Sequence, residues 1–272
     1  MENNEVKDPL LDYPKYSRKM KATHTLLIPS MLEYHMPLFE GVLKQCGYKV
    51  EVMKNEGPEV VSEGLKYVHN DTCYPALLVI GQMIDNLNHR NDLDKVVLVI
   101  TQTGGGCRAS NYIHLLRKAL VKAGYGYIPV LSLNMSRLEK DSTIEITYPL
   151  VKKVIAALTY GDVIMYLHNK TRTYEIEKGA SDKLAHEWTN KLLKQFENKK
   201  GTSYRHIKKN IKEMALDFAN LKMDLSHKKP KVGVVGEIYI KYAQLGNNHL
   251  EDFLVSQDAE VMVPGVYGFM LY

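Results

Sequence analysis

The sequence predicts an α/β protein with a Rossmann-like parallel sheet, a helical insert and the start of a second α/β unit. Three observations predict this class. Short apolar runs alternate with helical patterns over the first half of the chain. Residues 95–101 form a nearly continuous apolar run, which is typical of a strand buried on both faces of a parallel sheet. Residues 142–227 show only amphipathic helical patterns, and strand-like runs resume after Pro230.

The first domain, doubly wound, is expected over residues 22–141 and follows a tail over residues 1–21. Gly47 ends its first helix because glycine readily adopts the left-handed cap conformation. Pro75 suits the first turn of a later helix. The expected elements are a strand over residues 23–31, a helix over 32–47, a strand over 49–53, a helix over 74–87, a strand over 95–101, a helix over 108–123 and a strand over 126–134.

The second half of the chain is expected to form a helical region over residues 142–229 and a truncated α/β unit over residues 230–272. The lysines of the helical region are interpreted as solvated helix faces. The last unit has an apolar strand that runs into a loop over residues 231–242, a helix over 247–255 and a strand over 259–264. Because a domain of about 100 residues is typical, we interpret the chain as a fragment of a longer protein.

Composition narrows the class of protein. The net charge of +5 is mild and the basic residues are spread out, apart from a helical stretch in the second half. A nucleic-acid-binding protein would show a denser basic stripe. The first 21 residues lack the apolar core of a signal peptide, and no apolar run is long enough to span a bilayer. Three distant cysteines make no disulfide framework. We expect a cytoplasmic protein that binds neither nucleic acid nor membrane.

Two cysteines lie where an expected strand gives way to a helix, Cys73 and Cys107. The carboxyl ends of strands are where open α/β sheets hold ligands, and a helix N-terminus favours the thiolate form. Thiolates bind iron or zinc, so both residues are candidate metal ligands. The alternative for Cys73 is a small buried apolar side chain beside a turn-forming segment. Cys46, in the last turn of a helix, is interpreted as core packing.

Three glycines precede Cys107 and offer backbone N–H groups to an anion such as a phosphate, a carboxylate or the sulfides of a cluster. The candidate cofactor-binding residues are Gly104, Gly105, Gly106, Arg108 and Asn111. The alternative is a tight turn between strand and helix. The pattern matches neither the dinucleotide-binding motif nor the P-loop. His69, His89 and His114 are the histidines of this half nearest the loops. His114, as a lone helical histidine, is interpreted as structural, and no four-ligand zinc pattern or nucleophile elbow is present.

Four segments resemble the 2-hydroxyacyl-CoA dehydratase and CoA enzyme activase-related family, in particular the dehydratase-like portion of the long activase-related proteins. They are residues 25–53, 69–87, 102–120 and 230–242. The resemblance implies a cytoplasmic iron–sulfur protein of anaerobic bacteria. Its cysteines would hold a [4Fe–4S] or larger cluster, with Cys73 and Cys107 at the family's ligand positions.

The resemblance also implies partners: an ATP-dependent activator module, fused or separate, that supplies low-potential electrons, acyl-CoA as a substrate class, and contacts with further subunits or domains. A third cysteine ligand is expected further along than this chain extends. ATP-binding motifs are absent, so the chain is not expected to hydrolyse ATP or to be catalytic alone. The alternative function is a non-redox module that binds a phosphate or acyl-CoA group. A weaker one is a Cys73–Cys107 disulfide switch, which requires Cα atoms within about 7 Å.

Overall fold

The computed structural model describes residues 13–69, 71–102, 112–134, 144 and 146–270. The contacts within the chain divide it into two units. The first comprises residues 1–30 and 47–146, and the second comprises residues 31–46 and 147–272. Each unit has its own buried core. The α/β class expected from the sequence is confirmed.

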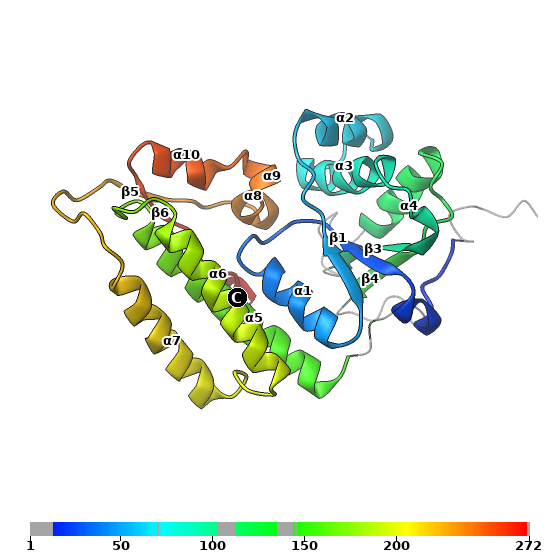
Figure 1. Cartoon of the computed structure of the whole chain (residues 1–272). Coiled ribbons are helices and arrows are strands. Elements are labelled where there is room, and N and C mark those ends of the chain that lie inside the picture. The colour runs from blue at the N-terminus through cyan, green and yellow to red at the C-terminus, as the bar shows by residue number, and fades with distance from the viewer. Residues whose placement is uncertain (1–12, 70, 103–111, 135–143, 145, 271–272) are drawn as a thin grey trace, which may run out of the picture. The chain divides into compact units, whose positions relative to one another are not determined.

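The first unit contains a four-stranded sheet in the order β2-β1-β3-β4, with every neighbouring pair parallel (Figure 1). Leu27 in β1 pairs with Glu51 on one side and with Leu98 on the other. β3 is central and its residues 96–100 are all buried, as the apolar run predicted. The strands are β1 (Thr25–Ile28), β2 (Lys49–Val52), β3 (Val96–Gln102) and β4 (Val130–Asn134).

Three helices of this unit pack together on one side of the sheet: α2 (Pro58–Tyr67), α3 (Tyr74–Asn88) and α4 (Tyr112–Lys122) (Figure 1). Connections between parallel strands are right-handed as a rule. The connection from β2 to β3 and the connection from β3 to β4 run in the same direction across the sheet, so the rule places their helices on the same face. Two short 3-10 turns, Arg18–Ala22 and Leu93–Lys95, precede β1 and β3.

α2 was not expected from the sequence, because its buried face consists of Val60 and a glycine, Gly64. The contact with α3 explains that glycine. A Cβ atom on Gly64 would lie 2.5 Å from the carbonyl oxygen of Leu77, and one on Gly81 would overlap the carbonyl oxygen of Val60. The two helices therefore meet backbone to backbone, an approach that only glycine permits.

The second unit is built on four longer helices: α1 (Met36–Gln45), α5 (Tyr148–Thr171), α6 (Ala180–Glu197) and α7 (Tyr204–Ala219). α5 contacts each of the other three. The buried aromatic side chains at the centre are Tyr160, Trp188, Phe196 and Phe218. α5 begins with Thr147, whose side chain accepts a hydrogen bond from the Leu150 N–H at 3.3 Å. Among the described residues, no helix combines the length and apolar character needed to cross a membrane.

The end of the second unit carries a parallel pair, β5 (Lys231–Gly233) and β6 (Glu260–Met262). The strand expected from Lys231 is confirmed only as far as Gly233, and the loop expected before Tyr242 is wrong in part. Residues Ile238–Tyr242 form helix α8, because Gly236 turns the chain at φ 140° and the Glu237 carboxylate accepts a hydrogen bond from the Ile240 N–H. The remaining helices are α9 (Gln244–Asn247), α10 (Leu250–Ser256) and α11 (Val266–Met270).

Candidate functional site at the carboxyl edge of the sheet

The strand order of the sheet reverses between β1 and β3, because the chain goes from β1 to β2 on one side and from β3 to β4 on the other. In open α/β sheets the ligand site lies outside the carboxyl ends of the strands at such a switch point. The segments that leave this edge are the turn at Ser30 after β1 and residues 103–111 after β3. The latter lie outside the described residues.

Cys73 occupies the N-cap of α3 in an extended conformation and is half-buried. The expected strand before Cys73 is wrong, because the preceding element is helix α2. Its Sγ lies 3.2 Å from the hydroxyl oxygen of Tyr112, the first residue of α4. The N-termini of α3 and α4 therefore contact each other through these two side chains. The Cys73 side chain does not accept a capping hydrogen bond from the N–H groups of α3. Two helix starts at one place form an environment that favours an anionic group.

A buried polar network fixes this edge of the sheet. The Gln82 side chain in α3 accepts a hydrogen bond from the Ser30 N–H at 3.1 Å and donates one to the Asn55 carbonyl oxygen at 2.9 Å. Asn55, which follows β2, donates from Nδ2 to the Gln82 carbonyl oxygen and to an Asp85 carboxylate oxygen at 2.7 Å. Gln82 is 1% exposed. The segments after β1 and β2 are thus tied to the helix that carries Cys73.

Sequence analysis missed this network and the role of Tyr112. A signal was present, because Gln82 and Asp85 are polar residues within an otherwise apolar helical stretch. Buried polar groups require partners, so such residues indicate a specific hydrogen-bonded contact. Nothing in the pattern identified Ser30 and Asn55 as those partners.

Only one of the expected site residues is described, Cys73. Cys107, Gly104, Gly105, Gly106, Arg108 and Asn111 all lie outside the described residues. Cys107 precedes Tyr112 by five positions in the sequence. Cys46 is half-buried at the end of α1 in the second unit, rather than enclosed in the core.

The histidines near the loops are at the surface. His69 is 76% exposed, with its Nδ1 atom 3.3 Å from an Asp71 carboxylate oxygen. His89 is equally exposed and its ring contacts the Asp85 carbonyl oxygen at 2.8 Å. His114 is exposed on α4. The contacts of His69 and His89 are with residues close to them in sequence.

Across the described part of the chain, no three His, Cys, Asp or Glu side chains gather closely enough to hold a metal ion. Cys73 is a soft sulfur donor of the type that iron–sulfur clusters use. The described residues therefore offer the right type of ligand for such a cluster. They supply only one such ligand, Cys73, and a cluster needs several.

The first unit is thus an open α/β module with its candidate site at the switch point. Residues 25–98 match a family described as CoA enzyme activase uncharacterised domain (DUF2229). This match supports a relation to the activase-related proteins. It covers β1, β2 and α3, including Cys73, and ends before Cys107. No curated protein and no solved structure matches the chain.

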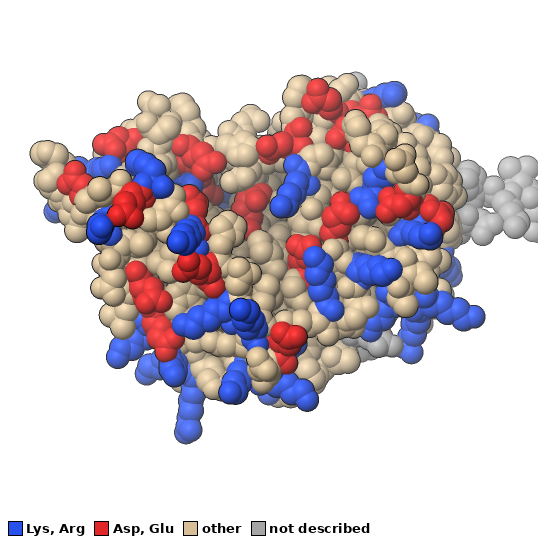
Figure 2. All heavy atoms as spheres, in the orientation of Figure 1, with Lys and Arg blue, Asp and Glu red and all other residues tan. Residues whose placement is uncertain are grey.

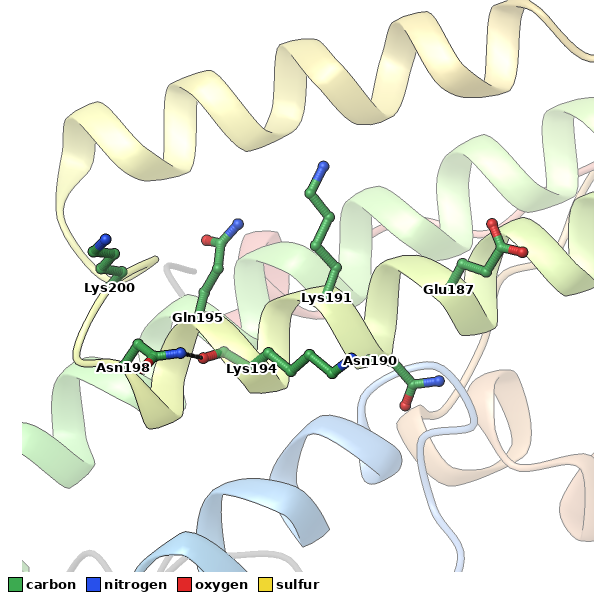
Figure 3. Close-up of a pocket in the computed structure, with 7 residues that line it drawn as sticks. All are labelled: Glu187, Asn190, Lys191, Lys194, Gln195, Asn198 and Lys200. Carbon is green, nitrogen blue, oxygen red and sulfur yellow. Dashed lines mark hydrogen bonds between the residues drawn. The ribbon is translucent and has the colours of Figure 1, made fainter.

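The second unit carries a hollow along the solvent-facing side of α6, with a volume of about 710 Å³. Two rows of side chains border it, each with a spacing of four residues (Figure 3). One row comprises Glu187, Lys191 and Gln195, and the other comprises Asn190, Lys194 and Asn198, with Lys200 at the end. The hollow is open and polar, unlike the enclosed apolar clefts that hold most small ligands.

The second unit also contains a buried polar cluster between α5 and α10. The Asn169 side chain donates to a Glu251 carboxylate oxygen at 2.5 Å, and the guanidinium of Arg172 lies 3.6 Å from the same oxygen. Burial raises the pKa of Glu251, and the hydrogen bond from Asn169 and the charge of Arg172 only partly oppose it. Burial and the Glu251 carboxylate raise the pKa of the Tyr34 hydroxyl. The cluster is only partly satisfied, because the Nε and Nη2 atoms of Arg172 are buried without a hydrogen-bond partner among the described residues.

Proposed function

We propose that this activase-related chain is an iron–sulfur redox module in which Cys73 and Cys107 are two ligands of a cluster. The contact between Cys73 and Tyr112 carries the proposal. It joins the starts of α3 and α4, and Cys107 belongs to the segment that leads directly into α4. One cysteine from the junction of α2 and α3 and one from the connection of β3 and α4 would thus serve one site at the switch point of the sheet.

The chemistry of the site supports this function. Thiolates select iron–sulfur clusters over hard cations, and helix N-termini stabilise the negative charge that such ligands carry. A cluster would supply one-electron transfer. Cys73 would hold the iron and Tyr112 would orient the sulfur through its hydroxyl group. Further ligands would come from another segment or subunit, and electrons from an ATP-dependent activator.

Anaerobic reconstitution with iron and sulfide, followed by iron and sulfide analysis and a visible absorption spectrum, tests the proposal. The matched variants are Cys73→Ser, Cys107→Ser and Cys46→Ser. We expect the unaltered chain and the Cys46→Ser control to retain iron and the charge-transfer absorption, and the other two variants to lose both. Iron that persists in both of those variants, or its absence from the unaltered chain, would contradict the proposal.

A second candidate is a non-redox module that binds a phosphate or acyl-CoA group. It is favoured by the start of α3, where the N-cap residue Cys73 makes no side-chain capping hydrogen bond. Such groups bind anions. Calorimetry with inorganic phosphate and with coenzyme A tests it. Binding should survive Cys73→Ser and fail in Gly105→Val if this candidate is right, and no heat with either ligand would exclude it.

A further inference from the structure

The turn end of the hairpin formed by α6 and α7 concentrates the positive charge of the chain. Residues 191–212 contain eight basic side chains and one acidic one, Glu197. This segment carries +7, so the rest of the chain carries −2 of the total of +5. Figure 2 shows blue side chains over this part of the hairpin, at the bottom of the view. The basic residues are Lys191, Lys194, Lys199, Lys200, Arg205, Lys208, Lys209 and Lys212.

This charge opposes the stability of the helix that carries it. The first turn of α7 contains no acidic residue, and cations near a helix N-terminus oppose the helix dipole. Arg205 and Lys209 lie four positions apart, as do Lys208 and Lys212, and like charges at this spacing repel each other. Of these four, Lys209 has an ion pair within the described chain, with Glu213 at 3.7 Å. Ser203 caps α7 by accepting a hydrogen bond from the His206 N–H at 3.4 Å, but this cap leaves the positive charge in place. A concentration of like charge that is only partly compensated indicates a function.

The hollow on α6 lies beside this charge. Lys191 points toward α7 (Figure 3), contacts the ring of Trp188 and pairs with Glu213 at 3.1 Å. Lys194 and Lys200 are exposed, and neither has an ion pair among the described residues. Positive charges that remain free at the edge of a groove attract a partner of opposite charge.

The lining of the groove indicates the class of partner. An amphipathic helix that inserts into a membrane surface presents a row of exposed apolar side chains, and the exposed large ones of the hairpin are the separate residues Tyr204 and Leu216. None of the described residues that line the groove is aromatic, so a nucleic acid would find no ring there on which its bases could stack. The amide groups of Asn190 and Asn198 instead suit the peptide groups and carboxylates of a protein chain.

We propose that the groove along α6, with the basic turn beside it, is a docking surface for an acidic segment of a partner protein. The two rows of side chains are ridges with a groove between them, into which the side chains of another helix or an extended strand fit. Lys194 and Lys200 pair with the carboxylates of that segment, and the turn of the hairpin attracts it from a distance. This function is independent of any cluster in the first unit.

Fluorescence anisotropy with labelled poly-L-glutamate, at low and high ionic strength, tests this proposal. The variant Lys191→Gln/Lys194→Gln/Lys200→Gln removes the charge of the groove. Lys194→Gln/Lys200→Gln leaves the contact between Lys191 and Glu213 intact. The control, Lys49→Gln/Lys54→Gln/Lys118→Gln, removes the same charge from exposed positions of the first unit. Circular dichroism verifies that the helices persist.

We expect salt-sensitive binding that weakens roughly five- to tenfold in the triple groove variant and less than about twofold in the control. The double variant should fall between them. No binding at low ionic strength, or an equal loss in the control, would overturn the proposal. So would tighter groove-dependent binding of an oligothymidylate or of phosphatidylserine vesicles.

Discussion

The sulfur of Cys73 lies 3.2 Å from the hydroxyl oxygen of Tyr112, so that the residue before α3 touches the first residue of α4. The two residues are 39 positions apart in sequence. α3 begins after the crossover from β2, and α4 begins after β3. The contact thus joins two connections of the parallel sheet at the edge where such folds bind ligands.

A double-mutant cycle on Cys73→Ala and Tyr112→Phe measures this contact. Because the two side chains touch, we expect a coupling free energy of about 0.5–1 kcal/mol in urea unfolding. Tyr125→Phe serves as the control partner of Cys73→Ala. Tyr125 donates to Asn88 at 2.8 Å and follows the opposite end of α4, roughly 16 Å along the helix axis. The control pair should be additive, and equal coupling in both cycles would contradict a direct contact.

Gln82→Leu should destabilise the first unit, because it leaves the Ser30 N–H and the Asn55 carbonyl group without their side-chain partner. The loss of two buried hydrogen bonds predicts a decrease of about 2–3 kcal/mol in the free energy of unfolding. Gln257→Leu, at an exposed position, is the control and should change it by less than about 0.5 kcal/mol. The midpoint of urea unfolding measures both. A change at Gln82 no larger than that of the control would show that the network is not a stabilising element.

The fold class followed from the sequence because its main elements depend on local pattern. The apolar run that became β3 and the proline at the start of α3 identified those elements without knowledge of their neighbours. α2 was missed because its buried face includes Gly64, which adds no apolar side chain to the pattern. Helix α8 was not predicted because an apolar stretch is compatible with either a strand or a helix. Glu237 favours the helix, because its side chain caps the start of α8.

The candidate site was predicted only in part. The position of Cys73 at a helix start follows from Pro75 and the turn before it. Its contact with Tyr112 depends on how two helices pack across a sheet, which no local pattern encodes. The partners of Gln82 could not be predicted either, because they also depend on how separate segments pack together. The remaining site residues, from Gly104 to Asn111, lie outside the described part of the chain.

Gly64→Ala and Gly81→Ala should each destabilise the first unit, because the new Cβ would meet backbone of the neighbouring helix. Backbone cannot move aside as a flexible side chain does, so we expect a loss of about 1–3 kcal/mol or more for each. Gly268→Ala in α11 is the control, since nothing lies within 4 Å of its Cβ position. There alanine should leave the stability unchanged or raise it by up to about 1 kcal/mol. The midpoint temperatures of thermal unfolding of the three variants, compared with that of the unaltered chain, test this prediction.

Asp162→Asn should weaken the attachment of α11. The Asp162 carboxylate accepts hydrogen bonds from the Val266 N–H at 2.7 Å, the Tyr267 N–H at 2.8 Å and the His35 ring at 3.0 Å. An asparagine keeps one oxygen, so we expect a decrease in unfolding free energy of about 2–3 kcal/mol at neutral pH. Asp94→Asn, at an exposed position of the first unit, is the control for the loss of one negative charge.

The effect of Asp162→Asn should depend on pH. Burial opposes ionisation of Asp162, but the hydrogen bonds from His35 and the two N–H groups outweigh it and hold its pKa below 3.8. A lowered carboxyl pKa contributes stability above the value of the unfolded chain, and this contribution disappears as the pH falls through the folded pKa. The difference between wild type and variant should therefore be full at pH 6–7 and shrink below about pH 4. A constant difference down to the acid transition would contradict this.

Glu251→Gln should show the opposite pH dependence. Burial raises the pKa of Glu251 above 4.5, even though Asn169 donates to its carboxylate and Arg172 lies nearby. The negative charge of Asp252 adds to the shift. A raised carboxyl pKa means that the folded protein binds the proton more tightly than the unfolded chain. The stability linked to that proton is full below about pH 4.5 and is lost as the pH rises through the folded pKa.

Glutamine resembles the protonated carboxyl group in size and charge and does not titrate. The wild-type protein should therefore lose stability relative to Glu251→Gln between about pH 4.5 and pH 7. At pH 4.5 the protonated Glu251 of the wild type makes no ion pair with Arg172 either, so we expect the variant to be about as stable as the wild type at pH 4.5 and more stable than the wild type at pH 7. Urea unfolding at several pH values between these limits measures the difference. A wild type that gains stability over the variant as the pH rises would mean that the ionised Glu251–Arg172 pair outweighs burial.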